Sequence, residues 1–472
     1  MRIGNTELAF RPDRETIVHG TEDPKVRVLF SIAPAEGQAI PRSPVTVVVL
    51  LDCSGTVRRF GMGPEEAKRW IEIARERSEL RVADSDQRRM YLLRGQTLEE
   101  ARASSTCPLS VAAAALEEVA AELRDNDVCC LVGFATRAGC LYDGRKGVGR
   151  QSLRDVLADI QRDPSSPGLG DLTRMEEGAR IASALIRSEP GAKRVRRLVI
   201  ITDGIVEDQV ESLRQLEEIR NEGVAVTTIG VGQEFDEEFL SRIADWTGGS
   251  YHYAAQAEDL ERGLGEEFGS LHIVGGIALR VSARGLTGAV VNSVVQLVPQ
   301  IRMFEEIRLR DDWFEVEVGD VVGSAGASFV AELSLPWLAT GKHAVGELEL
   351  EWRDPESQGP QKSSYVVIVE CLPADRPAPE VDAEIEDMAM RLQVYRAERA
   401  AQWAQVSGRP GLSTVRLREA SQILNRLGEH DLAERFEQQA TDVEKKTVDS
   451  DRTKKLKDWV RRLGQRGTDQ AE

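Results

Sequence analysis

The chain reads Val45-Thr46-Val47-Val48-Val49-Leu50-Leu51-Asp52-Cys53-Ser54-Gly55-Thr56 where a long apolar run meets an acid and two hydroxyls. Such a run is typical of a strand that is buried on both faces of a parallel sheet. In open α/β sheets, ligands bind just beyond the carboxyl ends of the strands. Asp52, Ser54 and Thr56 alternate along the loop, so a tight turn would point their oxygens at one place. Oxygen ligands of this kind suit a hard cation such as Mg²⁺.

Two later segments add polar residues to this pattern. Arg196 to Asp203 reads as a second apolar strand, and it ends in an acid that Gly204 follows. Thr173 precedes a helical stretch at 174–188, where its hydroxyl would serve as a helix cap or as a ligand. Taken singly, an acid at a strand end is often only a turn or helix cap, and Asp-Gly is a common turn dipeptide. The ordered set is more specific than any of its members.

Together these residues resemble the metal ion-dependent adhesion site of von Willebrand factor A (VWA) domains, whose pattern is Asp-x-Ser-x-Ser, then Thr, then Asp. The matching metal-site residues here are Asp52, Ser54, Thr56, Thr173 and Asp203. Thr56 stands where the family usually has Ser, which keeps the hydroxyl and adds a methyl. Gly178 and the Thr247 to Tyr251 segment (Thr-Gly-Gly-x-Tyr) also match, and the resemblance extends over 44–271.

The resemblance implies a binding function rather than catalysis. It implies Mg²⁺ as the cation, with Mn²⁺ and Ca²⁺ as alternatives, and a protein partner that presents an Asp or Glu carboxylate to it. Bacterial intracellular VWA proteins resemble adaptors that work with ATPase-containing assemblies. The chain has no Walker-type phosphate-binding loop, so it would not supply nucleotide chemistry itself.

Two alternatives stay open beside the adhesion site. Asp52-x-x-Gly55-Thr56 after an apolar strand also resembles haloacid dehalogenase-like phosphohydrolases, whose nucleophilic Asp is followed two residues on by an acid. Position 54 is Ser here, so the general acid that protonates a leaving group is missing. The other alternative is a structural VWA scaffold without bound metal.

Composition favours a cytoplasmic protein without nucleic-acid contacts. The net charge of −18 disfavours nucleic acid and anionic membranes, since phosphate contacts need clustered Lys and Arg. The first residues have no apolar core of signal-peptide length, and no stretch reaches the length of a membrane span. Six cysteines without a Cys-x-x-Cys pair indicate reduced thiols rather than a disulfide framework or a zinc site.

We expect four regions. Residues 44–271 alternate strands and helices, which predicts an α/β, doubly wound, mostly parallel sheet of the VWA and Rossmann-like kind. Within it, 57–108 is an insert predicted to be helical, at 64–80 and 86–93, and to lie near the metal face as a lid, a docking element or decoration. Residues 272–373 read as short antiparallel strands of a β-sandwich, and the N-terminal β segment at 1–43 should join them. The VWA unit would then be inserted in the sandwich.

The remaining region, residues 380–472 beyond a proline-rich linker, is helical in pattern. Its tail at 451–464 has the pattern of a basic amphipathic helix. Apolar Leu456, Trp459, Val460 and Leu463 alternate there with Lys454, Lys455, Lys457, Arg461 and Arg462. Such a helix can serve as a docking segment. In an acidic protein, packing against its own chain is the favoured interpretation.

Overall fold

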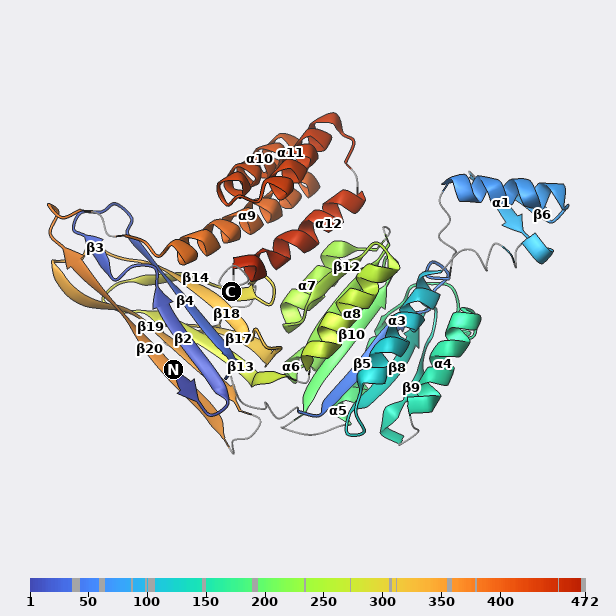
Figure 1. Cartoon of the computed structure of the whole chain (residues 1–472), viewed down its shortest axis with the longest axis horizontal. Coiled ribbons are helices and arrows are strands. Elements are labelled where there is room, and N and C mark those ends of the chain that lie inside the picture. Colours follow the sequence, from blue (N-terminus) through green and yellow to red (C-terminus); the bar gives the residue numbers. More distant parts are fainter. Residues whose placement is uncertain are drawn as a thin grey trace.

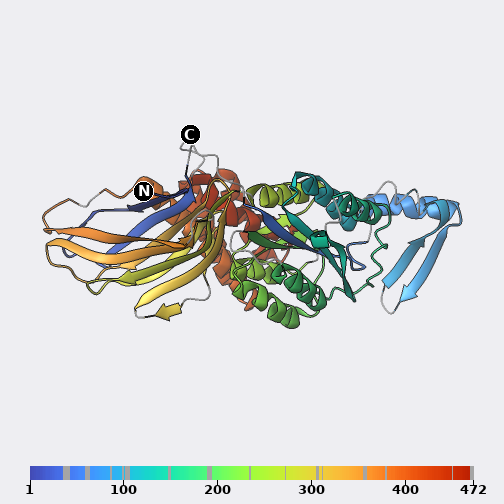
Figure 2. The same ribbon diagram turned by 90° about the horizontal axis from the view of Figure 1, so that it is seen from below.

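The computed structural model describes residues 1–467 apart from 36–42, 59–63, 86–87, 98–99, 101–106, 147–149, 189–193, 233–234, 272, 305–307, 311, 355–358, 378–379 and 449. In these residues a central α/β unit lies between a two-sheet β region and a small helix–hairpin projection, with a helical region above the first two (Figures 1 and 2). The described helices include none long and apolar enough to cross a membrane.

The central sheet has the strand order β12-β11-β10-β5-β8-β9. All of its neighbouring strands are parallel except β8 and β9, which are antiparallel. The strands are β5 (Val45–Asp52), β8 (Val128–Phe134), β9 (Ala138–Asp143), β10 (Val195–Thr202), β11 (Ala225–Val231) and β12 (Tyr251–Ala254). The chain fills one side of β5 and then crosses to β10, so the topological switch point lies between β5 and β10.

Helices cover both faces of this sheet. Every residue of β5 is buried, and successive side chains enter two different cores: Val47 and Val49 one, Val48 and Leu50 the other. This explains why β5 is a continuous apolar run rather than an alternating one. The covering helices are α3 (Pro108–Glu122), α4 (Arg150–Arg162) and α8 (Ala257–Leu271) on the first core, and α5 (Glu176–Arg187), α6 (Gln209–Asn221) and α7 (Glu237–Thr247) on the second.

The insert is only partly helical. Its described elements are α1 (Pro64–Glu76) and a hairpin of β6 (Leu80–Ser85) and β7 (Arg88–Leu93), so the helix predicted at 86–93 is wrong. A six-residue run is too short for its periodicity to separate helix from strand, and the pairing partner is supplied by β6. Leu109 N donates to Val57 O at 3.1 Å, so the insert leaves and returns at one point next to the Asp52 loop. It projects beyond the carboxyl end of β5 (Figure 1).

The β region consists of two six-stranded sheets, with orders β1-β2-β4-β18-β14-β15 and β16-β17-β13-β19-β20-β3, around one apolar core. N-terminal strands join both sheets: β1 (Arg2–Ile3), β2 (Thr6–Pro12), β3 (Thr16–Val18) and β4 (Lys25–Pro34). The later strands are β13 (Val274–Gly285), β14 (Val290–Val298), β15 (Arg302–Met303), β16 (Arg308–Arg310), β17 (Trp313–Val322), β18 (Ala327–Ser334), β19 (Gly341–Arg353) and β20 (Pro360–Leu372). The α/β unit thus falls between strands of one β region.

The C-terminal region contains α9 (Ala383–Val406), α10 (Pro410–Arg426), α11 (His430–Lys445) and α12 (Ser450–Arg461). Their shared core includes Val295 and Val330, so the helices also pack on the outer face of β14 and β18. The basic helix α12 packs back on its own chain. Arg461 makes two buried hydrogen bonds of 2.8 and 2.7 Å to Asp245 of α7, which joins the helical region to the α/β unit.

Candidate metal centre

The end of β5 lies beside the end of β10, which is the switch point of the sheet. Leu51 pairs with Ile201, so Thr202 comes opposite Asp52. Thr202 Oγ1 donates to Asp52 Oδ2 at 2.6 Å, and Ser54 N donates to Asp52 Oδ1 at 2.8 Å. Both carboxylate oxygens of Asp52 are therefore engaged inside the protein, and the residue orients the Ser54 loop.

Burial makes this carboxylate costly to ionise. Asp52 is fully buried, and desolvation raises its pKa above the ordinary value, against the hydrogen bonds from Thr202 and Ser54. An adjacent cation favours the charged form of such a carboxyl group and would offset the cost. The electrostatics of Asp52 therefore suit a neighbouring positive charge.

A chain of oxygens connects the two loops. Ser54 Oγ lies 2.9 Å from Thr56 Oγ1, which donates to Asp203 Oδ1 at 2.8 Å. In an octahedral Mg²⁺ site with oxygens at 2.0–2.1 Å, adjacent ligands lie about 2.9 Å apart. Oxygens held at hydrogen-bond distance in the protein already have the spacing of neighbouring ligands. The donor set and its geometry therefore fit a hard divalent cation.

Thr173 reaches the same place from a third loop. A Cβ built on Gly204 would lie 3.0 Å from Thr173 Oγ1 and 3.3 Å from Thr56 Oγ1, so both hydroxyls border one point. Glu207 N donates to Thr173 O at 2.9 Å, which ties the Thr173 loop to the Asp203 loop. Thr173 and Gly204 are buried, whereas Thr56 and Asp203 are half-buried. The fold thus gathers all five predicted residues at one edge of the sheet.

Two residues that hold this edge together, Thr202 and Asp208, were not predicted. Thr202 has no motif of its own, and its role follows only from its place opposite Asp52. Asp208 accepts hydrogen bonds from the backbone nitrogens of Met175 and Glu176, at 2.8 and 3.1 Å, at the start of α5. A carboxylate at a helix N-terminus is a familiar stabilising contact, but this cap comes from 32 positions along the chain. Sequence spacing alone gives no signal for it.

The charged side chains around the cluster pair with each other. Arg58 contacts Asp171 and donates to Ser54 O at 3.1 Å. Arg174 Nε lies 3.6 Å from Glu207 Oε2, and both residues line a polar cavity of about 430 Å³. Among the described residues, no group of three or more His, Cys, Asp or Glu could hold a metal ion. A cation site built mainly from hydroxyls differs from such clusters.

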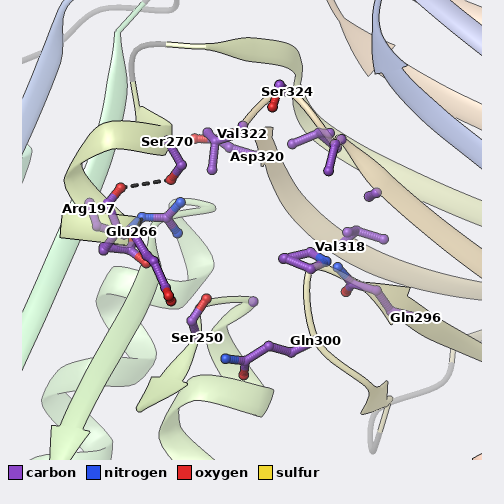
Figure 3. A pocket seen from close by; sticks show the side chains of 18 of the residues that line it. Arg197, Ser250, Glu266, Ser270, Gln296, Gln300, Val318, Asp320, Val322 and Ser324 are labelled. Atoms are coloured by element: carbon purple, nitrogen blue, oxygen red, sulfur yellow. Dashed lines mark hydrogen bonds and ion pairs between the residues drawn. The ribbon is translucent and has the colours of Figure 1, made fainter. Parts of the chain in front are cut away.

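A second cavity, of about 370 Å³, lies where the α/β unit meets the β region (Figure 3). Arg197 sits near the start of β10, so this cavity is at the opposite end of the sheet from Asp203. Arg197 Nε lies 2.9 Å from Glu267 Oε1, and Arg462 of the C-terminal region contacts Glu266 at 3.2 Å. None of the predicted metal-site residues lines it. The first pair lies within the α/β unit, and the second joins the C-terminal region to that unit.

Comparison with known proteins finds two family models that match parts of the chain. Residues 111–265 match the model of the von Willebrand factor type A domain, and residues 383–466 match that of the Sll0103-like, C-terminal alpha-helical domain. The uncharacterized protein sll0103 of Synechocystis sp. is 21% identical over 350 residues, covering 71% of this chain and 79% of that protein. The VWA match begins after the Asp52 loop and includes Thr173 and Asp203.

Two solved structures share the whole architecture. A von Willebrand factor type A protein from Catenulispora acidiphila aligns over 97% of both chains, with a TM-score of 0.70 and 13% identity. The ArnB paralog VWA2 from Sulfolobus acidocaldarius aligns over 98% of this chain and 99% of its own, with a TM-score of 0.55 and 12% identity. At this identity the likeness concerns the fold.

The chain therefore contains a VWA domain, followed by a helical domain of the Sll0103 type. The predicted fold class is confirmed: a VWA fold with a mostly parallel sheet, additional β-sheets and a C-terminal helical region. VWA domains are in general protein interaction modules and are typically non-catalytic.

Proposed function

We propose that this protein is a metal-dependent binding module that captures a carboxylate of a protein partner at the Asp52 edge of its VWA sheet. The observation that carries the proposal is the oxygen chain from Ser54 through Thr56 to Asp203, with spacings of 2.9 and 2.8 Å. These spacings match neighbouring ligands of octahedral Mg²⁺.

The roles of the residues follow from their contacts. Ser54 and Thr56 would hold the cation through their hydroxyls, and Thr173 and Asp203 directly or through water. Asp52 uses both oxygens on Ser54 N and Thr202, so it fixes the loop from behind. When bound, Mg²⁺ offers an exchangeable position that an Asp or Glu carboxylate can take. Mn²⁺ and Ca²⁺ are the alternative cations.

An intracellular adaptor of bacterial type, cytoplasmic and working with an ATPase-containing assembly, is the cellular role that we propose with this chemistry. Two observations support this role. The sequence has no Walker-type loop, so nucleotide chemistry would come from a partner, and VWA domains in general bind proteins. The phosphohydrolase alternative is tested by a phosphatase assay in Mg²⁺. Turnover that disappears in Asp52→Asn would favour that alternative.

Titration calorimetry with Mg²⁺ tests the proposed site. Asp52→Ala should weaken Mg²⁺ binding by about 10–100-fold, because the buried carboxylate orients the ligand loop. Asp171→Ala is the matched control, since this carboxylate is exposed near the cluster and belongs to no oxygen chain. Ser54→Ala removes one proposed ligand but keeps Asp52, so Thr202 Oγ1 and the backbone nitrogen of residue 54 keep their acceptor. This variant should also bind Mg²⁺ weakly. Equal affinities for wild type, Asp52→Ala and Ser54→Ala would contradict the proposal.

A further inference from the structure

The rim of the oxygen cluster carries two exposed aliphatic side chains. Leu172 directly precedes Thr173, and Ile205 directly follows Gly204. Their exposed fractions are 41% and 62%. Single exposed apolar residues are common on protein surfaces, so exposure alone decides nothing. What matters here is how these two side chains are held and what surrounds them.

The residues next to both side chains are buried in the protein. Val206 is 3% exposed and packs in the core under the sheet, so the residue before it in the loop faces solvent. Leu172 N donates to Thr136 Oγ1 at 3.1 Å, and Thr173 after it is buried. The exposure of Ile205 and Leu172 is therefore built into ordered loops that also carry Asp203 and Thr173.

Among the described residues, two of the arginines at this rim already lie next to carboxylates of the same chain. Arg58 is paired with Asp171, and Arg174 lies within ion-pair distance of Glu207. A partner residue that flanks the captured carboxylate therefore meets aliphatic surface more readily than an unpaired charge. Burying an aliphatic side chain contributes far more to binding than adding a contact to a solvated ion pair.

We infer that Leu172 and Ile205 select partners whose carboxylate is flanked by aliphatic side chains. The inference rests on the proposed function, because the cation supplies the attraction for the carboxylate at the centre. The occupant is thus a protein segment with an Asp or Glu between apolar residues. The centre provides charge complementarity, and the aliphatic rim provides specificity.

Three labelled peptides in MgCl₂, followed by fluorescence anisotropy, test this. Their cores are Ile-Glu-Ile, Gly-Glu-Gly and Ile-Gln-Ile, each between glycines. Wild-type protein should bind the Ile-Glu-Ile peptide about tenfold more tightly than the Gly-Glu-Gly peptide, since partial burial of an aliphatic side chain is worth about that factor. The Ile-Gln-Ile peptide should bind much more weakly, because it lacks the carboxylate.

Ile205→Ser and Leu172→Ser should remove most of the preference for the Ile-Glu-Ile peptide while leaving binding of the Gly-Glu-Gly peptide and of Mg²⁺ unchanged. Val290→Ser is the matched control, because Val290 is 60% exposed on β14 of the β region. Equal affinities for the two acidic peptides would overturn the inference and leave the proposed function standing. If Mg²⁺ bound but neither acidic peptide did, carboxylate capture itself would fail.

Discussion

Thr56 Oγ1 donates a hydrogen bond of 2.8 Å to Asp203 Oδ1, although 147 positions separate the two residues. This bond joins the loop after β5 to the loop after β10 at the switch point of the sheet. Thr56 also lies 2.9 Å from Ser54 Oγ, so it is the middle member of the oxygen chain. The hydroxyl of Thr56 therefore connects the two loops into one site.

Substitutions of Thr56 can therefore distinguish the effect of its hydroxyl group on Mg²⁺ binding from the effect of its side-chain volume. Thr56→Val has nearly the same volume but no oxygen, and we expect Mg²⁺ affinity to fall by about 10–100-fold. Loss of the two hydrogen bonds of Thr56 Oγ1 should lower the free energy of unfolding by about 2 kcal/mol. Thr56→Ser keeps the hydroxyl and should bind Mg²⁺ like wild type in calorimetry. If the valine and serine variants bound equally, Thr56 would not be a ligand.

Gly204 provides a test of the space between the hydroxyls. An added Cβ would lie 3.0 Å from Thr173 Oγ1 and 3.3 Å from Thr56 Oγ1, closer than ordinary contacts. Gly204→Ala should displace these hydroxyls and weaken Mg²⁺ binding by about tenfold.

Gly265→Ala is the control for Gly204→Ala. This position lies inside α8 and has nothing within 4 Å of the added Cβ. The substitution should stabilise the protein by about 1 kcal/mol and leave Mg²⁺ affinity unchanged. Full Mg²⁺ affinity in Gly204→Ala would show that the hydroxyls near Gly204 do not hold the cation.

The buried ion pair between Arg461 and Asp245 should anchor the helical domain to the VWA domain. Arg461 is 3% exposed and Asp245 is 8% exposed. Asp245→Ala leaves a buried guanidinium without its partner, which typically costs about 3–5 kcal/mol. Urea unfolding should show this loss, whereas Glu419→Ala, which breaks an exposed pair with Arg416, should cost at most about 1 kcal/mol. Equal losses in the two variants would contradict the anchoring role.

Glu398 should make stability depend on pH. Burial raises its pKa from 4.5 to about 7, with Lys457 acting in the opposite direction and Glu237 adding to the shift. Because the folded-state pKa exceeds the unfolded one, the unfolded chain ionises first as pH rises. The contribution of Glu398 to the free energy of unfolding is therefore fully present below about pH 4.5 and is lost progressively as the pH rises to 7.

The variant Glu398→Gln cannot ionise and should escape this loss. Between pH 5 and pH 8, the free energy of unfolding of wild type should fall relative to that of Glu398→Gln by about 2.5 kcal/mol, since one pKa unit corresponds to about 1.4 kcal/mol. Urea unfolding at the two pH values measures the difference. A constant difference between the two proteins would show that Glu398 titrates normally.

Much of the VWA fold could be predicted because its signals are local. The apolar runs of β5 and β10 specify buried strands, and the polar residues that end them specify the edge where ligands gather. Asp52 ends β5, and the other four candidate ligands lie on loops that follow a strand or precede a helix, so topology brings all five to one edge. The resemblance to the VWA pattern then indicated which polar residues belong to one site.

The features that could not be predicted depend on contacts between segments that are distant in the sequence. The segment that forms β7 was predicted to be helical. It forms a strand because its six residues pair with β6, and nothing within the segment itself signals that pairing. Thr202 and Asp208 hold the site through contacts 150 and 32–33 positions away. The exposed state of Ile205 follows from the burial of Val206, which only the packed core reveals.

A crystal of the protein grown with Mn²⁺ tests the central claim most directly. The anomalous scattering of Mn²⁺ locates the cation without reference to any assumed ligand. We predict one peak at the carboxyl edge of the VWA sheet, in direct contact with the hydroxyl oxygens of Ser54 and Thr56 and absent from crystals of Ser54→Ala. A saturating Mn²⁺ concentration that gives no peak at this edge, or the same peak in Ser54→Ala, would contradict the metal-dependent account.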